Sequence, residues 1–159
     1  MEPRRALVVE DEHSIQRELA HLVADMGLTV KSTETLTDGI EAARATAYDL
    51  ILVDLGLADG SGLELLRDLQ SAKPESRVAG TAATAVIVVS STMDMAARSR
   101  SVELGAQDFI SKPFRHAEIR RRIERVLSSR GEGESAYLAS RRNSRLCSND
   151  SPSGRRNHR

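Results

Sequence analysis

Short apolar runs that end at polar or charged residues constrain the fold of this chain more than any other feature. The runs do not alternate between apolar and polar positions, which is typical of strands covered on both faces in a parallel sheet. We predict strands at residues 6–9, 50–53, 85–89 and 108–111, and a weaker strand around Val30.

Apolar residues in the intervening segments recur with the period of an amphipathic helix. Gly27 is expected to end the first helix in a left-handed conformation. The alternating order of strands and helices predicts the α/β class, with a doubly wound five-stranded parallel sheet flanked by five helices. The helices are predicted around residues 15–26, 36–43, 63–69, 94–104 and 119–127.

The composition excludes several classes of protein. Lys and Arg number 23, as do Asp and Glu, so the formal net charge is zero and gives no case for a nucleic-acid binder. The single cysteine, Cys147, excludes a disulfide framework and a cysteine-based zinc site within one chain. Every apolar run is far shorter than the roughly 20 residues of a membrane span, and the N-terminus does not fit a signal peptide. A cytoplasmic protein without membrane contacts is expected.

The charge is distributed unevenly along the chain. Residues 1–127 carry 16 Lys and Arg against 20 Asp and Glu, whereas residues 128–159 carry 7 against 3. The second segment is rich in Ser, Gly, Asn and Arg and has few sizeable apolar residues. We therefore predict one domain over residues 1–127 and a basic, disordered tail over residues 128–159. A solvated tail is favoured over a weak electrostatic contact with an acidic partner or nucleic acid.

Polar side chains follow four of the predicted strands directly. Glu10 and Asp11 follow the first strand, and Asp54 follows the third. Ser90 and Lys112 follow the fourth and the fifth. Because sites in open α/β sheets form at the carboxyl ends of the strands, these side chains are expected to meet at one edge. Each residue alone is explained more simply as a polar strand end, but the complete set is not.

The chemistry of this set favours phosphoryl transfer. Neighbouring carboxylates repel one another unless a cation joins them, and Mg²⁺ prefers such oxygen ligands. An aspartate beside Mg²⁺, a lysine and a hydroxyl group can attack phosphorus and form an aspartyl phosphate. The metal and the lysine would stabilise the charge on the transferring group.

Four segments, in a fixed order, resemble a known family: ALVVEDE, DLILVDLGLADGSGLELL, VIVVSS and LGAQDFISKPF. Over roughly residues 5–127 the chain resembles the receiver domain of two-component response regulators, and single-domain CheY-like regulators in particular. The Lys-Pro-Phe signature of that family is intact at residues 112–114. The resemblance implies the flavodoxin/CheY-like fold and a role in bacterial phosphorelay signalling.

The resemblance also implies a phosphoacceptor and a metal site. Asp54 would be the phosphoacceptor, and Mg²⁺ the cofactor. The metal would be held by Glu10, Asp11, Asp54 and the backbone carbonyl of Gly56, with Asp11 favoured as a direct ligand. Glu10 stands where the family more often has Asp, so its longer side chain could act through a metal-bound water.

The resemblance implies a second group of residues, which would bind the phosphoryl group and change conformation when it is bound. Ser90 would supply the switch hydroxyl and Lys112 the ammonium group that binds phosphate. Phe109 stands where the family often has Tyr, and conformational switching and plain packing are equally good interpretations of it. The Lys112–Pro113 bond would be cis, as in the family.

Two further departures from the family concern loops. Ala58 replaces a common proline after the acceptor, and the link over residues 73–84 is longer than usual. A looser turn and a surface insertion are expected.

The resemblance implies a signalling switch instead of an enzyme that acts on other substrates. A sensor histidine kinase or histidine phosphotransfer protein would donate the phosphoryl group, and the chain would later hydrolyse its own acyl phosphate. Phosphorylation would reshape the face formed by the fourth helix, fifth strand and fifth helix. Because no DNA-binding helix pair follows residue 127, we expect output through an unknown protein target, phosphate relay or a phosphorylation-dependent dimer, without direct DNA binding.

Two alternatives belong to other classes. A docking module that is never phosphorylated is disfavoured because every position of the set keeps a competent side chain. An aspartate-nucleophile phosphatase is less favoured still, since Gly56 stands where such enzymes carry a second aspartate.

Overall fold

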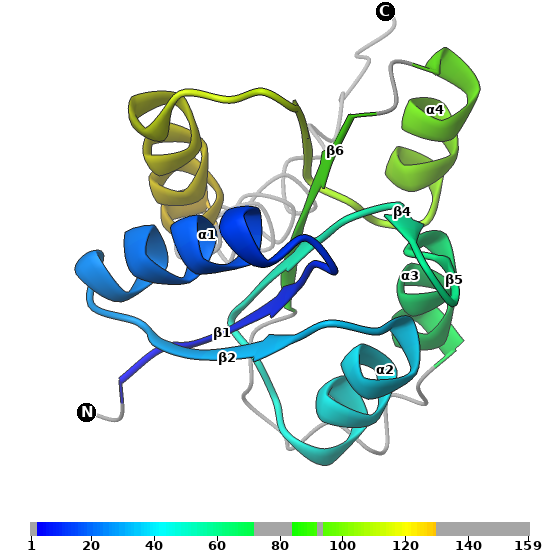
Figure 1. The fold of residues 1–159 in the computed structure, drawn as a ribbon, viewed down its shortest axis with the longest axis horizontal. Coiled ribbons are helices and arrows are strands. Elements are labelled where there is room, and N and C mark those ends of the chain that lie inside the picture. The colour runs from blue at the N-terminus through cyan, green and yellow to red at the C-terminus, as the bar shows by residue number, and fades with distance from the viewer. Residues whose placement is uncertain (1–2, 72–83, 92–93, 130–159) are drawn as a thin grey trace, which may run out of the picture.

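The computed structural model describes residues 3–71, 84–91 and 94–129, and within them a five-stranded parallel sheet lies between two layers of helices (Figure 1). The strands lie side by side in the order β2-β1-β3-β6-β7, and each neighbouring pair is parallel. The predicted doubly wound parallel sheet is therefore confirmed. Its strands are β1 (Arg5–Val9), β2 (Thr29–Thr33), β3 (Leu50–Val53), β6 (Ala85–Ser90) and β7 (Asp108–Ser111).

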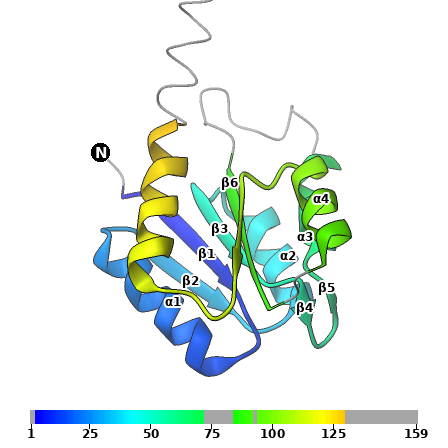
Figure 2. The same ribbon diagram turned by 90° about the horizontal axis from the view of Figure 1, so that it is seen from above.

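Five helices cover the two faces of this sheet. Figure 2 shows α1 and the helix over residues 116–129, here termed the fifth helix, on one face, with α2, α3 and α4 on the other. The five helices predicted from apolar periodicity are confirmed, with bounds that differ by a few residues. The labelled helices are α1 (His13–Asp25), α2 (Leu36–Ala45), α3 (Leu63–Ser71) and α4 (Met95–Glu103).

Alternate residues of the central strands pack into opposite halves of the core. In β1, Ala6 and Val8 pack in the cluster that contains residues of α1 and the fifth helix. Leu7 and Val9 pack in the cluster that contains residues of α2 and α3. All four side chains are fully buried. This double coverage explains why the strands read as continuous apolar runs.

Local sequence fixes where several helices begin and end. Gly27 and Gly105 lie just beyond α1 and α4 with φ angles of 91° and 99°, a conformation that costs glycine least. The side chains of Thr35 and Asp94 accept backbone hydrogen bonds at the starts of α2 and α4. At these helix ends the chain turns back toward the sheet. Because all five strands are parallel, their carboxyl ends lie at the same edge of the sheet.

The structure contains an antiparallel hairpin that the sequence pattern does not predict. It consists of β4 (Gly56–Leu57) and β5 (Gly60–Ser61), directly after β3. Strands of two residues are too short to show a recognisable alternation. Residues 72–83 and 130–159 lie outside the described part, so the surface insertion and the disordered tail stay predictions. Among the described helices, none has the length and apolar character needed to cross a membrane.

Candidate functional site

Backbone hydrogen bonds align the polar strand ends at one edge of the sheet. The Asp54 N–H donates to the Val9 carbonyl at 3.0 Å, directly before Glu10. The Lys112 N–H donates to the Ser90 carbonyl at 3.0 Å. Both bonds extend the parallel ladders beyond the last regular pairs. The strand arrows in Figure 2 point toward this edge, where the β4–β5 hairpin also lies.

Three side chains from three strand ends form an ion triad, composed of Glu10, Asp54 and Lys112. The Lys112 ammonium donates to Glu10 Oε2 at 2.8 Å and to Asp54 Oδ2 at 3.1 Å. Glu10 and Asp54 come from neighbouring strands, so both carboxylates lie within reach of one cation. Three of the five residues that the sequence predicts to meet are thus joined directly by hydrogen bonds.

The ion triad is almost fully enclosed. The side chains of Glu10, Asp54 and Lys112 are 1%, 8% and 10% exposed. Burial, reinforced by the charge of Asp54, raises the pKa of Glu10 to about 7 despite the hydrogen bond from Lys112. Burial alone would lower the pKa of Lys112, but its hydrogen bonds to the two carboxylates outweigh this effect and raise it. In the ion triad, two carboxyl groups thus share one ammonium group.

A third acid completes a cluster that can hold a cation. Carboxylate oxygens of Glu10, Asp11 and Asp54 all lie within 4.8 Å of one another. Asp11 is half-buried, whereas the other two are buried. Hard oxygen donors around uncompensated negative charge match the preference of Mg²⁺, and this trio offers no sulfur or imidazole for a softer metal. The donor set fits the magnesium ion that the sequence predicts.

The remaining predicted groups border the ion triad. Gly56 begins the hairpin, and its N–H donates to Asp54 Oδ1 at 3.1 Å. Ser90 is the last residue of β6 and is 1% exposed. The peptide bond between Lys112 and Pro113 is cis. The same edge of the sheet therefore carries the acids, a hydroxyl group and the lysine.

Phe109 lies on β7, away from the ion triad but beside α4. Its side chain is 7% exposed and packs in the core half that contains α2 and α3. The Arg98 guanidinium of α4 lies 5.8 Å from the centre of the Phe109 ring, within the range of a cation–π contact. The Phe109 ring therefore links β7, the strand that ends directly before Lys112, with α4, the least buried of the labelled helices.

Gln16 of α1 supports the site and was not predicted. Its buried side-chain amide donates to the Glu10 carbonyl at 3.1 Å and to the Thr33 carbonyl at 3.0 Å. It thereby joins the ends of β1 and β2 to the first turns of α1. A sequence signal existed: Gln16 stands three and seven residues before Leu19 and Val23, so it is a polar residue on the apolar face.

Contacts at its turn and directly after β5 fix the β4–β5 hairpin. Asp59 accepts hydrogen bonds from the N–H groups of Leu36 and Thr37 at 2.8 and 3.1 Å, which ties the hairpin to the start of α2. These bonds hold the pKa of Asp59 below its usual value. A Cβ on Gly62 would lie 2.2 Å from the Asp54 carbonyl oxygen, so only glycine fits there. The loop after Asp54 is therefore positioned by contacts that sequence motifs do not reveal.

These features define a class of protein: a doubly wound α/β domain with an acidic, cation-binding edge bridged by a buried lysine. Comparison with known proteins identifies the family. The model of the response regulator receiver domain matches residues 6–124. The chain therefore belongs to the response regulator receiver family, as its sequence motifs predict. Domains of this family are signalling switches that accept phosphate from histidine kinases.

Two relatives illustrate the match in sequence. The KDP operon transcriptional regulatory protein KdpE of Escherichia coli is 36% identical over 121 residues, which are 76% of this chain and 50% of that protein. The cell cycle transcriptional regulator CtrA of Caulobacter vibrioides is 30% identical over 132 residues, 82% of this chain and 54% of CtrA. The chain spans about half the length of these relatives.

Solved structures show the same fold. A CheY-like receiver domain protein from Methanospirillum hungatei is 22% identical with a TM-score of 0.73, covering 83% of this chain and 99% of its own. A BeF3-activated DrrB receiver domain is 26% identical with a TM-score of 0.67, covering 80% of this chain and 99% of its own.

Proposed function

We propose that Asp54 accepts a phosphoryl group in a reaction that requires Mg²⁺. The observation that carries this proposal is the Lys112 ammonium group, which bridges Asp54 and Glu10 at a buried edge beside Asp11. A carboxylate oxygen of Asp54 would attack the phosphorus of a phosphohistidine. The phosphorus–nitrogen bond would break, and the imidazole would leave with the electron pair.

The geometry supports a distinct role for each neighbour of Asp54. Lys112 Nζ already lies 3.1 Å from Asp54 Oδ2, so a small movement brings it to a phosphoryl oxygen. Ser90, the last residue of the neighbouring strand β6, would donate its hydroxyl to another phosphoryl oxygen. A bound Mg²⁺ would supply positive charge that stabilises the transferring group.

The hydrogen bonds of Glu10 support a division of labour between the acids. Its Oε2 accepts from Lys112 and its Oε1 accepts from the Glu12 N–H at 3.2 Å. Asp11 is half-buried, so its carboxylate is more accessible to an ion. We therefore assign Asp11 and Asp54, with the Gly56 carbonyl, as direct metal ligands, and Glu10 as a ligand that acts through a metal-bound water.

The partners of this switch follow from the family. A histidine kinase or histidine phosphotransfer protein would donate the phosphoryl group. The output surface would be the face of α4, β7 and the fifth helix, which would contact an unidentified protein target or a second copy of the chain.

Intact mass spectrometry after incubation with Mg²⁺ and acetyl phosphate tests the proposal. We expect one added phosphoryl group, which does not form when EDTA is present during the incubation and which is absent in Asp54→Asn. Asp38→Asn is the matched control, because Asp38 is an exposed aspartate of α2 that does not belong to the carboxylate cluster. Phosphorylation of Asp54→Asn at the wild-type level would refute the assignment.

A titration with beryllofluoride separates rapid hydrolysis from failure to react. If no covalent adduct is detected but beryllofluoride with Mg²⁺ shifts the NMR signals around Asp54, hydrolysis outpaces detection and the proposal stands. If neither reagent has an effect, the docking-module interpretation replaces it.

A further inference from the structure

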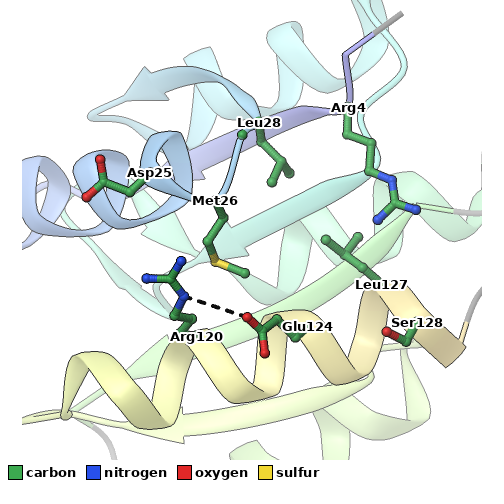
Figure 3. Close-up of a pocket in the computed structure, with 9 residues that line it drawn as sticks. Arg4, Asp25, Met26, Leu28, Arg120, Glu124, Leu127 and Ser128 are labelled. Atoms are coloured by element: carbon green, nitrogen blue, oxygen red, sulfur yellow. Dashed lines mark ion pairs between the residues drawn. The ribbon is translucent and has the colours of Figure 1, made fainter. Parts of the chain in front are cut away.

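A pocket of about 330 Å³ lies at the opposite edge of the sheet from the ion triad. It opens between the end of α1 and the last turns of the fifth helix (Figure 3). Met26, Leu28 and Leu127 give it an apolar wall, and its volume lies at the lower end of the range for ligand-sized pockets. None of these residues takes part in the proposed phosphoryl transfer.

The charges on the rim of this pocket are separated. Figure 3 shows Arg4 near Leu127 and Ser128, and Asp25 at the opposite end. Both residues are exposed. In the part of the chain that the structure describes, no ion pair includes Arg4 or Asp25. Two further charged residues line the pocket, Arg120 and Glu124, and they form an ion pair with each other at 3.6 Å (Figure 3). Arg4 and Asp25 therefore remain as the charges at the two ends of the pocket that no ion pair of the described chain balances.

The chain that follows the fifth helix carries the complementary pattern in the matching order. Ser128 lines the pocket, and residue 129 is the last that the structure describes. After Arg130 and Gly131 come the acids Glu132 and Glu134, then Tyr137 and Leu138, then two arginines at residues 141–142.

We propose that residues 132–142 of the same chain dock into this pocket. Tyr137 and Leu138 would cover Met26, the partly exposed residue of the apolar wall, with the preceding acids facing Arg4 and the following arginines facing Asp25. The nine residues from Ser128 to Tyr137 span at most about 30 Å, which is ample for a pocket that Ser128 itself lines. Covalent attachment gives the segment a high effective concentration, so modest contacts suffice to hold it.

The only cysteine of the chain allows a direct test on the full-length protein. A nitroxide on Cys147 would lie nine residues after Leu138. With the methionine methyl groups labelled with ¹³C, we expect the nitroxide to broaden the Met26 signal. The Met95 signal is the internal control, because Met95 lies on α4, on the other face of the sheet, and is exposed. Equal broadening of Met26 and Met95, or of neither, would overturn the proposal.

Two sets of variants show which residues hold the segment. Replacing both Tyr137 and Leu138 with Ser should remove the selective broadening of Met26. Leu146→Ser, which changes an apolar residue outside the docking segment, should leave it in place. Selective broadening that survives the loss of Tyr137 and Leu138 would contradict the docking of this segment.

Charge reversal tests the direction of docking. Arg4→Glu should weaken the selective broadening, and changing Glu132 and Glu134 to Arg in the same chain should restore it. Failure of this rescue would contradict the proposed order of contacts. Mixing nitroxide-labelled chains with separate ¹³C-labelled chains identifies a second copy as the occupant. Broadening that appears fully in that mixture would overturn docking within one chain.

Discussion

The helices α1 and α4 are attached to the same sheet by different means. In α1, four side chains are buried, yet no side chain caps its first turn in the described structure. In α4, Ser101 alone of the described residues is buried, while Met95 and Val102 are 73% and 58% exposed. The first turn of α4 is capped by Asp94. Burial thus holds α1, whereas a cap and a few partly buried side chains hold α4.

The difference matters because the two helices serve different parts of the molecule. Through Gln16, α1 is joined to the carbonyl that follows β1, so its movement would disturb the acidic cluster. Because little apolar surface is buried by α4, it can shift at a small cost in free energy. A helix that is weakly held beside Phe109 is suited to respond to a change at Lys112, which lies on the same strand end.

The largest contrast is expected from truncating one apolar side chain on each helix. Leu19→Ala removes a side chain that is 2% exposed and should lower the free energy of unfolding by about 2–5 kcal/mol. Val102→Ala removes a largely exposed side chain and should change it by less than about 0.5 kcal/mol. Urea unfolding measures both. Equal losses would show that α4 is packed as firmly as α1.

A smaller contrast is expected from the buried polar side chain of each helix. Gln16→Ala takes a donor from two buried carbonyl groups and should cost about 1–3 kcal/mol. Ser101→Ala removes a hydroxyl that bonds only to carbonyls of its own helix, and alanine favours helix, so the change should stay within about 0.5 kcal/mol. The same unfolding experiment tests both, and a costly Ser101→Ala would contradict the loose attachment of α4.

The caps should show the reverse asymmetry. Asp94→Ala should destabilise α4 locally by about 1 kcal/mol, because one of its first N–H groups loses its acceptor. Glu12→Ala at the start of α1 should have no such effect, since the Glu12 side chain makes no cap. Hydrogen exchange of the amides in each helix measures the local change. Faster exchange throughout the domain in Asp94→Ala would mean that α4 unfolds only with the whole sheet.

The smallest effect is expected from the contact between Arg98 and Phe109. Arg98→Met keeps most of the side-chain length but removes the charge over the ring. A double-mutant cycle with Phe109→Leu should give a coupling energy of about 0.5–1 kcal/mol. A coupling energy of zero would show that the ring and the guanidinium are merely near each other.

The fold is predictable because its strands are buried on both faces. A continuous apolar run such as residues 50–53 is compatible with few structures other than a strand that is buried on both faces. Asp54 follows this run directly, so the end of the strand determines where Asp54 lies. The same reasoning, applied to the order of residues alone, places Glu10 and Lys112 at one edge of the sheet. Which side chains lie side by side there depends on the strand order β2-β1-β3-β6-β7, which the alternating pattern alone does not specify.

Other features depend on contacts that no single segment encodes. The role of Gln16 requires the β2 carbonyl of Thr33 to lie beside the end of β1. The β4–β5 hairpin depends on the bonds between Asp59 and the start of α2, which lies more than 20 residues earlier. The contact of Arg98 with Phe109 depends on how α4 is rotated. Each needs tertiary geometry that local periodicity does not specify.

The ion triad joins groups that are far apart along the chain. Lys112 follows Glu10 by 102 residues and Asp54 by 58. Closing loops of this length costs chain entropy before the contacts can form. A ribosome-bound chain that ends before β7 has the acids but lacks the ammonium group that bridges them. The completed triad therefore arises only when synthesis of the sheet is finished, and a nascent chain cannot present it early.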